Sequence, residues 1–233
     1  MPQIIDLTQT FETGMPGFRM RDKTGQMTEF TAKIRPFLTH EESKPNYQGQ
    51  ASFEISEVSF QTSIGTYLDA PRHRHEGMGD IASLEISTLI STGIVVDARH
   101  CTPSKPLSAK DLPKAGQLAG RAVLINFGWD KHWGTEKYHE FPYVDRQGLQ
   151  HLLEAKISLF GVDTLNADWS QDLERPAHTW FLKNNIHIVE NLTGLAQLHR
   201  KVFRFFAIPL KVRDAAAFPV RAFAEINSPA EEV

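Results

Sequence analysis

The sequence predicts an α/β fold in which helices flank a mixed central sheet. Three observations support this: buried-strand patterns, helical patterns between them, and a length of 233 residues. That length suits one large domain, residues 1–233, and is too short for two domains with full cores. Four short apolar runs, β-branched-rich and bounded by Gly, Asp or Asn, are typical of strands buried on both faces. These runs are residues 94–96, 122–125, 159–162 and 186–189.

The first third of the chain is predicted to contain a strand and two loops. Residues 53–60 alternate apolar and polar positions, but the phase of the alternation changes along the segment. A bulge near Glu57 or a two-sided strand would explain this change. Residues 14–28 and 40–50 are polar enough to form mobile loops.

Two helices and two further strands are predicted in the second half. Apolar residues recur with helical spacing from Leu149 to Ile157, and Asp145 can cap that helix by accepting a backbone N–H. A short helix is expected from Pro176 to Lys183, because proline is tolerated in a first helical turn. The two further strands are expected at residues 202–210 and 220–226, with a turn between them at residues 214–217.

Composition excludes several classes of partner. The net charge of −3 provides no positive field to attract nucleic acid or an anionic membrane. No stretch approaches the ~20 apolar residues of a membrane span, and the start does not resemble a signal peptide, so we expect a cytoplasmic protein. The single cysteine, Cys101, cannot form an internal disulfide or a thiolate zinc site. Any metal site must therefore use histidines and carboxylates.

The densest group of chemically active residues lies at positions 61–75. A glycine permits a turn here and a proline stiffens its exit, and an acid, two histidines and two arginines lie on the loop. Loops held by a rigid strand often carry functional sites. By itself the group is equally compatible with a solvated surface turn. The residues are Asp69, Arg72, His73, Arg74 and His75.

Residues 63–73 resemble the signature of the cyclase family, metal-dependent hydrolases that include kynurenine formamidase. The family pattern reads His-x-Gly-Thr-His-x-Asp-x-Pro-x-His, and this chain reads Ser-Ile-Gly-Thr-Tyr-Leu-Asp-Ala-Pro-Arg-His. The resemblance implies a swivelling β/α fold and a homo-oligomer, most simply a dimer. Arms in the N-terminal third and residues 228–233 are candidates to reach across an interface. Further similar segments are residues 5–8, 14–16, 128–130, 161–164, 177–178, 188–192 and 219–222.

The resemblance also implies a metal site. Carried over by position, Asp69, His178 and Glu190 are metal ligands and His73 is a proton shuttle. Each also has a structural alternative. His178 resembles a surface histidine near a helix start, and Asp69 can cap its own turn. Glu190 ends an apolar strand, where an unpaired carboxylate costs several kcal/mol, so it needs a metal, an arginine or a shared proton.

Two of the family's ligands are replaced. Ser63 and Tyr67 stand where the family has its two loop histidines, and a hydroxyl and a phenol are poor zinc ligands. We therefore expect one divalent ion, zinc or manganese, where the family holds two. His75 and His100 remain candidates to replace the lost ligands.

Three functions are compatible with these residues. The first is a metal-dependent hydrolase of an amide or lactone bond in a small, cyclic or aromatic substrate. The second is a metal-independent cyclase, dehydratase or isomerase in which His73 and Tyr67 act as acid and base. The third is a catalytically inactive binding protein on the same scaffold. Candidates for an apolar pocket wall are Phe11, Phe18, Trp129 and Trp133.

Overall fold

The fold is built on a mixed sheet that closes on itself. The computed structural model describes residues 2–226, so the candidate arm at residues 228–233 lies outside the described residues. Within them, eight strands pair in the order β1-β12-β11-β7-β8-β9-β10-β6, and β6 also pairs with β12. The strands from β7 to β10 run parallel to one another, and the other pairings are antiparallel. Their bounds are β1 (Gln3–Asp6), β6 (Tyr67–Asp69), β7 (Ile90–Asp97), β8 (Ala122–Asn126), β9 (Leu159–Val162), β10 (His187–Glu190), β11 (Phe203–Pro209) and β12 (Ala217–Ile226).

The parallel strands carry the core, which confirms the predicted mixed α/β fold. Every residue of β8 and β9 is buried, as continuous apolar runs predict. Strand β10 begins at His187, one residue later than expected. Strand β12 begins at Ala217, inside the segment predicted as a turn, because Ala217 already pairs with Asp69 of β6.

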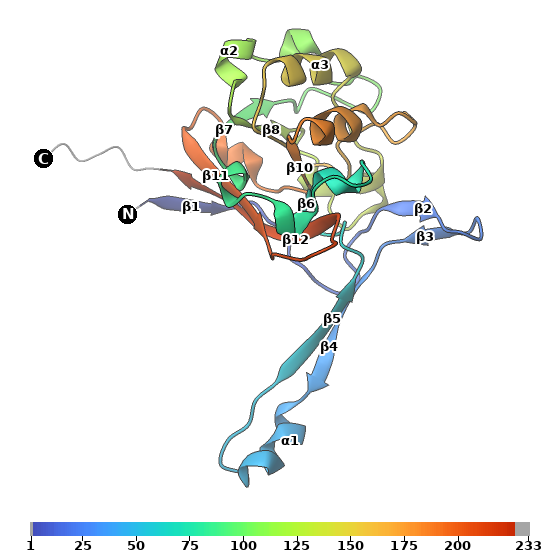
Figure 1. The fold of residues 1–233 in the computed structure, drawn as a ribbon, viewed down its shortest axis with the longest axis vertical. Helices are drawn as coiled ribbons and strands as arrows, with labels where there is room; N and C mark the ends of the chain where they lie inside the picture. The colour runs from blue at the N-terminus through green and yellow to red at the C-terminus, as the bar shows by residue number, and fades with distance from the viewer. Residues whose placement is uncertain (1, 227–233) are drawn as a thin grey trace, which may run out of the picture.

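Helices α2 (Ala115–Leu118) and α3 (Arg146–Glu154) lie side by side over the parallel strands (Figure 1). Helix α3 confirms the predicted cap, since Asp145 Oδ1 accepts the Gly148 N–H at 2.8 Å. The helix predicted at 176–183 is confirmed over those residues, and its central part, η8 (Ala177–Phe181), is a π-helix, which is wider than an α-helix. Among the described residues, no helix combines the length and apolar character needed to cross a bilayer.

Both segments predicted as loops contain regular structure. Residues 14–28 include a hairpin of β2 (Arg19–Arg21) and β3 (Met27–Glu29). Residues 40–50 contain α1 (His40–Ser43) followed by the 3₁₀ turn η1 (Lys44–Tyr47). Helix α1 forms because Thr39 and Glu42 cap it reciprocally, with side-chain bonds of 3.2 and 2.8 Å to each other's N–H.

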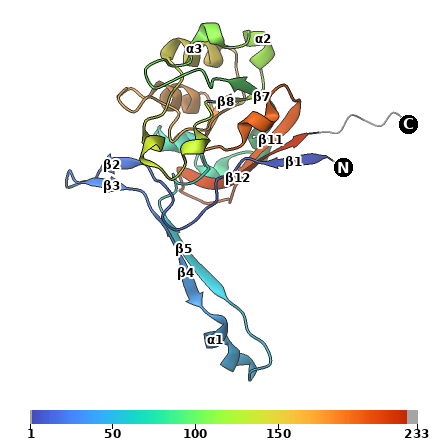
Figure 2. The same ribbon diagram turned by 180° about the vertical axis from the view of Figure 1, so that it is seen from behind.

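Strands β4 (Ala32–Leu38) and β5 (Ile55–Phe60) form a separate hairpin that projects far from the closed sheet (Figures 1 and 2). The irregularity expected near Glu57 lies in the partner strand, where the register shifts between Pro36 and Leu38. No residue of β5 is fully buried. The strand is thus exposed on both faces, which explains why its alternation lacks a single phase.

Strand β6 positions the functional residues. Asp69 lies between Ile188 of β10 and Ala217 of β12, so the strand is enclosed on both edges. Glu190 ends β10 at the edge where the parallel strands have their carboxyl ends, the usual location of ligand sites in α/β sheets. The closure of the sheet therefore brings the polar residues of β6 to this edge.

His187 should make the stability of the fold depend on pH. Burial lowers the pKa of its imidazole from 6.5 to about 4, because the charged form loses hydration. Between those values the unfolded chain binds a proton that the folded chain excludes, so stability falls as the pH falls. The contribution of His187 to the free energy of unfolding should drop by about 3 kcal/mol across this window. Urea unfolding of wild type and His187→Leu from pH 7 to pH 4 measures this contribution as the difference between their slopes; equal slopes in both proteins would contradict the assignment.

Candidate active site

Two adjacent strands place a phenol and two carboxylates on one face of the sheet. In the antiparallel pairing of β6 with β10, Tyr67 is opposite Glu190. Because side chains alternate along a strand, Tyr67 and Asp69 point to the same side. All three side chains are buried, and Asp69 and Glu190 have no exposed surface. The Tyr67 hydroxyl donates a hydrogen bond to Glu190 Oε2.

Turn η8 brings His178 to the same carboxylates. Its Nε2 lies 3.4 Å from Glu190 Oε1 and 3.7 Å from Asp69 Oδ2. On the other side of the ring, Nδ1 donates to Asp168 Oδ2 at 2.6 Å. Asp168 also accepts the backbone N–H groups of Ala177 and His178 at 2.7 and 3.1 Å. Asp168 therefore sets the orientation of the imidazole and directs Nε2 toward Asp69 and Glu190.

The neighbouring carboxylates favour the protonated, positively charged form of His178. Burial alone would lower the pKa of this imidazole, but the hydrogen bond to Asp168 and the nearby carboxylates of Asp69 and Glu190 outweigh burial and raise it well above 6.5. Burial would raise the pKa of Asp168, yet the hydrogen bond from His178 holds it below 3.8. Three buried carboxylates around one imidazole require a cation, either the imidazolium itself or a bound metal ion.

His73 completes the group from the short turn η2 (Pro71–His73) that follows β6. Its Nδ1 is 3.4 Å from Asp69 Oδ1, and its ring centroid is 5.6 Å from that of His178. One ligand atom from each of Asp69, His73 and His178 lies within 4.8 Å of the other two. The side chain of His73 is 33% exposed. It is thus the member of the group that a substrate or solvent can reach.

Asp69 shows that these residues fit a metal ion. Both of its carboxylate oxygens are buried, and neither has a hydrogen-bond partner in the part of the chain described. A buried charge without a partner is costly, and such groups are normally hydrogen-bonded or bound to metal. Carboxylate oxygens and imidazole nitrogens are ligands that zinc and manganese accept. The donor set around Asp69 therefore fits a divalent ion.

Tyr67 acts as a donor in this site. Burial first, then the charges of Glu190 and Asp69, raise the pKa of its hydroxyl well above 10. A phenolate that could coordinate a metal is therefore strongly disfavoured. Glu190 is held from two sides, since the N–H of Ala167 donates to Oε1 and the Tyr67 hydroxyl donates to Oε2. Oε1 also faces Nε2 of His178.

A cavity of about 430 Å³ opens onto this group. Its volume is in the range of small-molecule sites, which combine apolar walls with a few polar groups. Ser63, Tyr67, His73 and His178 line it, so four residues that the family resemblance singled out share one cavity. Its other lining residues include Phe18, Met20, Phe30, Arg74, Leu173 and Arg175.

Of the four aromatic residues predicted as pocket wall, Phe18 lines this cavity. Phe11 lines a different cavity at the base of the β4–β5 hairpin. Trp129 is buried in the main core cluster, and Trp133 packs against that cluster. Sequence patterns cannot separate wall from core aromatics, because both are apolar.

The two histidines considered as replacement ligands lie outside the metal group. A ring nitrogen of His75 is 2.9 Å from the carbonyl oxygen of Thr179. His100 is exposed after β7, and β8 and β9 separate β7 from β10 in the sheet. Among the described residues, the three-residue group consists of Asp69, His73 and His178.

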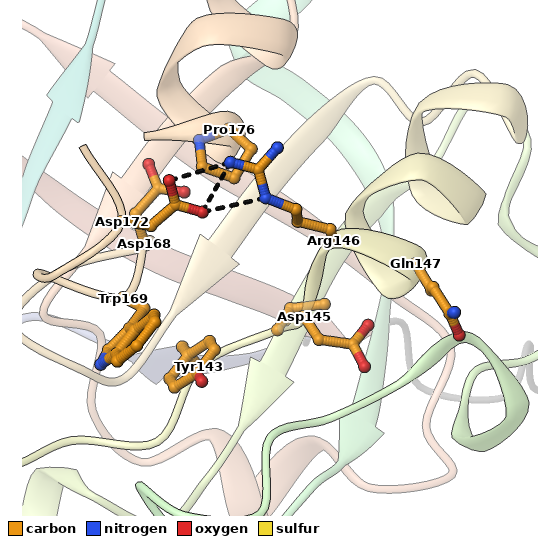
Figure 3. Close-up of a pocket in the computed structure, with 9 residues that line it drawn as sticks. Tyr143, Asp145, Arg146, Gln147, Asp168, Trp169, Asp172 and Pro176 are labelled. Atoms are coloured by element: carbon orange, nitrogen blue, oxygen red, sulfur yellow. Dashed lines mark hydrogen bonds and ion pairs between the residues drawn. The ribbon is translucent and has the colours of Figure 1, made fainter. Parts of the chain in front are cut away.

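Asp168 and Arg175 are site residues that no motif indicates. The available signal for Asp168 is its position after β9, at the carboxyl edge of the parallel strands. Asp168 also lines a second cavity of about 370 Å³, where Arg146 pairs with Asp172 at 2.8 Å (Figure 3). The guanidinium of Arg175 lies 5.9 Å from the ring centroid of Phe18, at the wall of the first cavity.

Comparison with known proteins gives a family match over most of the chain. The family model described as Putative cyclase matches residues 5–169. A kynurenine formamidase of Erythrobacter litoralis is 28% identical over 220 residues, covering 94% of this chain and 92% of that protein. A kynurenine formamidase of Bacillus cereus is 27% identical over 172 residues, covering 73% and 79%.

The fold also matches a solved structure. An isatin hydrolase bound to the product analogue thioisatinate superposes with a TM-score of 0.84, covering 97% of this chain and 93% of that chain. The two sequences are 23% identical, so this likeness concerns the fold.

Replacing Asp168 should destabilise the protein through His178. Asp168→Asn removes the charged acceptor of a buried imidazole, and breaking a buried ion pair costs about 3–5 kcal/mol of unfolding free energy. The control is Asp172→Asn, which breaks the partly exposed pair with Arg146 and should cost at most about 1 kcal/mol. Urea unfolding at pH 7 measures both. Similar losses in the two variants would show that Asp168 does not support His178.

Proposed function

The chain belongs to the cyclase family, and we propose that it is a metal-dependent hydrolase of an amide or lactone bond in a small, cyclic or aromatic substrate. One observation carries the proposal. The buried carboxylate of Asp69, without a hydrogen-bond donor in the described chain, faces two imidazoles at a cavity of small-molecule size. The kynurenine formamidase and isatin hydrolase similarities support the same class of reaction.

Asp69, His178 and Glu190 would hold one divalent ion, zinc or manganese. Nε2 of His178 lies toward both carboxylates, at 3.7 and 3.4 Å, and Asp168 holds the ring in that orientation. An ion bound there supplies Lewis-acid chemistry, which polarises a carbonyl and lowers the pKa of water. Tyr67 supports Glu190 from Oε2, leaving Oε1 toward His178.

His73 would move the proton in the reaction. It lies at the cavity, is partly exposed, and has Nδ1 3.4 Å from Asp69. The buried carboxylate can orient the imidazole. The other ring nitrogen can then exchange a proton with a substrate or a water molecule in the cavity.

The cavity walls support an aromatic or cyclic substrate. Phe18, Phe30 and Met20 provide apolar surface, against which a flat ring can pack. Arg175 lies beside Phe18 and can donate hydrogen bonds to a carbonyl or to the carboxylate that hydrolysis produces. The partner of this site would thus be a small molecule, in agreement with the net charge of −3.

A second candidate function uses no metal. His73 and Tyr67 line the same cavity, and the Tyr67 hydroxyl is bonded to Glu190. The raised pKa keeps the Tyr67 phenol protonated, so Tyr67 would be the acid, and His73 could serve as the base of a cyclisation, dehydration or isomerisation. An inactive binding protein would keep the cavity and show no turnover. Metal content separates the hydrolase from both.

Elemental analysis should find about one divalent ion per chain, by ligand count. Protein purified without chelator is compared with three variants. Glu190→Gln should bind near zero, Ser63→His with Tyr67→His should bind about two, and His73→Ala should keep its ion. If His73→Ala loses the ion while Glu190→Gln keeps it, His73 is the third ligand. A wild-type protein that holds no ion yet turns over substrate would favour the metal-free candidate.

His73→Ala should lower turnover by about 10²–10⁴, the usual contribution of a general acid or base, with metal content unchanged. Suitable substrates are a panel of small aryl formamides and cyclic amides, including isatin. Arg72→Ala is a matched control, because Arg72 is the exposed neighbour and pairs with Asp214 at 3.2 Å. Its rate should stay within about threefold of wild type, well below a general-base effect. A His73→Ala rate in that same range would remove His73 from the reaction.

A further inference from the structure

Arg175 is a half-buried cation at the wall of the active-site cavity of about 430 Å³. Its side chain lines that cavity beside Tyr67 and His178. The side chain is 19% exposed, against 47% for Arg146 at the second cavity. A guanidinium does not lose its proton when it is partly buried, because its pKa lies above 12. Arg175 therefore brings a fixed positive charge to the place where a substrate would bind.

Contacts within the protein occupy only part of this guanidinium. One Nη atom donates to Asn166 Oδ1 at 2.7 Å, which is the single side-chain hydrogen bond of Arg175 within the described chain. Its Nε is 3.8 Å from Asp168 Oδ2, too far for a hydrogen bond. That oxygen is already bonded to Nδ1 of His178. Because a guanidinium has five N–H donors, most of those of Arg175 remain for a ligand.

The lining of the cavity has more positive than negative charge. Among the described residues that line it, Asp172 is the single acid, and Arg74 is the second arginine. Both oxygens of Asp172 accept hydrogen bonds from Arg146, at 2.9 and 3.0 Å (Figure 3). Arg74 is more exposed than Arg175 and donates to Thr179 Oγ1 and to a backbone carbonyl oxygen. Arg175 is thus the cation in this lining that is best placed to meet an anionic group.

Arg175 lies close enough to the candidate metal group for one small substrate to reach both. Its Nε is 3.8 Å from Asp168 Oδ2, and the same oxygen is 2.6 Å from Nδ1 of His178. The guanidinium carbon is 5.9 Å from the ring centroid of Phe18, which provides apolar wall. A single aromatic ring packed beside Phe18 can therefore present one substituent to Arg175 and a neighbouring substituent to His178.

We propose that Arg175 determines specificity, by selecting substrates whose aromatic ring carries a carboxylate beside the amide bond that is cleaved. A planar guanidinium and a carboxylate form two parallel hydrogen bonds, which orient the ligand as well as attract it. The ring would lie beside Phe18 with its carboxylate on Arg175. The carbonyl of the amide would then face His178 and Asp69. This inference rests on the proposed hydrolase function and adds the charge that the substrate carries.

A pair of substrates tests the selection of charge. N-formylanthranilate and formanilide share a ring and a formamide and differ in one carboxylate, and wild type should favour the anionic member. Arg175→Gln should lower the ratio of their kcat/KM values about 10–100-fold, the usual effect of a charge-assisted hydrogen bond, with formanilide kinetics unchanged. Arg175→Lys should keep part of the ratio, because it retains the charge and loses the planar fork. Arg72→Gln removes an equal charge outside the cavity and should stay within about threefold of wild type.

A binding measurement separates this inference from the proposed reaction, because it needs no turnover. In isothermal titration calorimetry, wild type should bind anthranilate at least about tenfold more tightly than its neutral amide, 2-aminobenzamide, and Arg175→Gln should bind the two equally. Equal affinities in wild type, or a preference that Arg175→Gln leaves unchanged, would overturn the inference even if formanilide is cleaved. A preference that depends on Arg175, with neither formamide cleaved, would support the selection of charge and refute the hydrolase.

Discussion

The buried carboxylate of Asp69 is the constraint on which the rest of the site depends. It lies on β6, the strand that closes the sheet between β10 and β12, so backbone pairing on both edges prevents it from turning toward solvent. Its oxygens find no hydrogen-bond donor in the described chain. The closed sheet thus holds a charge where only a cation can compensate it, and two imidazoles stand beside that position.

The three buried carboxylates of the site differ in the hydrogen-bond donors that they receive. Asp168 is satisfied by two backbone N–H groups and by Nδ1 of His178, which also fixes the direction of the ring. Glu190 is satisfied by the Tyr67 hydroxyl and the Ala167 amide. Asp69 is left without such donors. Tyr67, at a position where the family signature has a histidine, thus supports the Glu190 carboxylate through its hydroxyl.

The β4–β5 hairpin is joined to the strand that carries Asp69 by a short segment of chain. Strand β5 ends at Phe60 and β6 begins at Tyr67. The ring of Phe60 packs edge-on against the rings of Phe11 and Phe218, with ring centroids 5.1 and 5.6 Å apart. Phe218 lies on β12, where it is paired with Leu68 of β6. This aromatic contact anchors the base of the β4–β5 hairpin to β12, which pairs with the strand that carries Asp69.

The sequence by itself determined the elements whose causes are local. The apolar runs of β8 and β9 and the Asp145 cap of α3 follow from burial and from hydrogen bonds a few residues apart. The loop pattern likewise indicated Asp69 and His73. Only the tertiary structure placed Asp168 on His178 and Tyr67 on Glu190, contacts that span 10 and 123 positions of the chain. It also left the alternating residues of β5 uncovered. Such contacts depend on how strands pair and where the sheet closes, and neither is encoded within a single window of sequence.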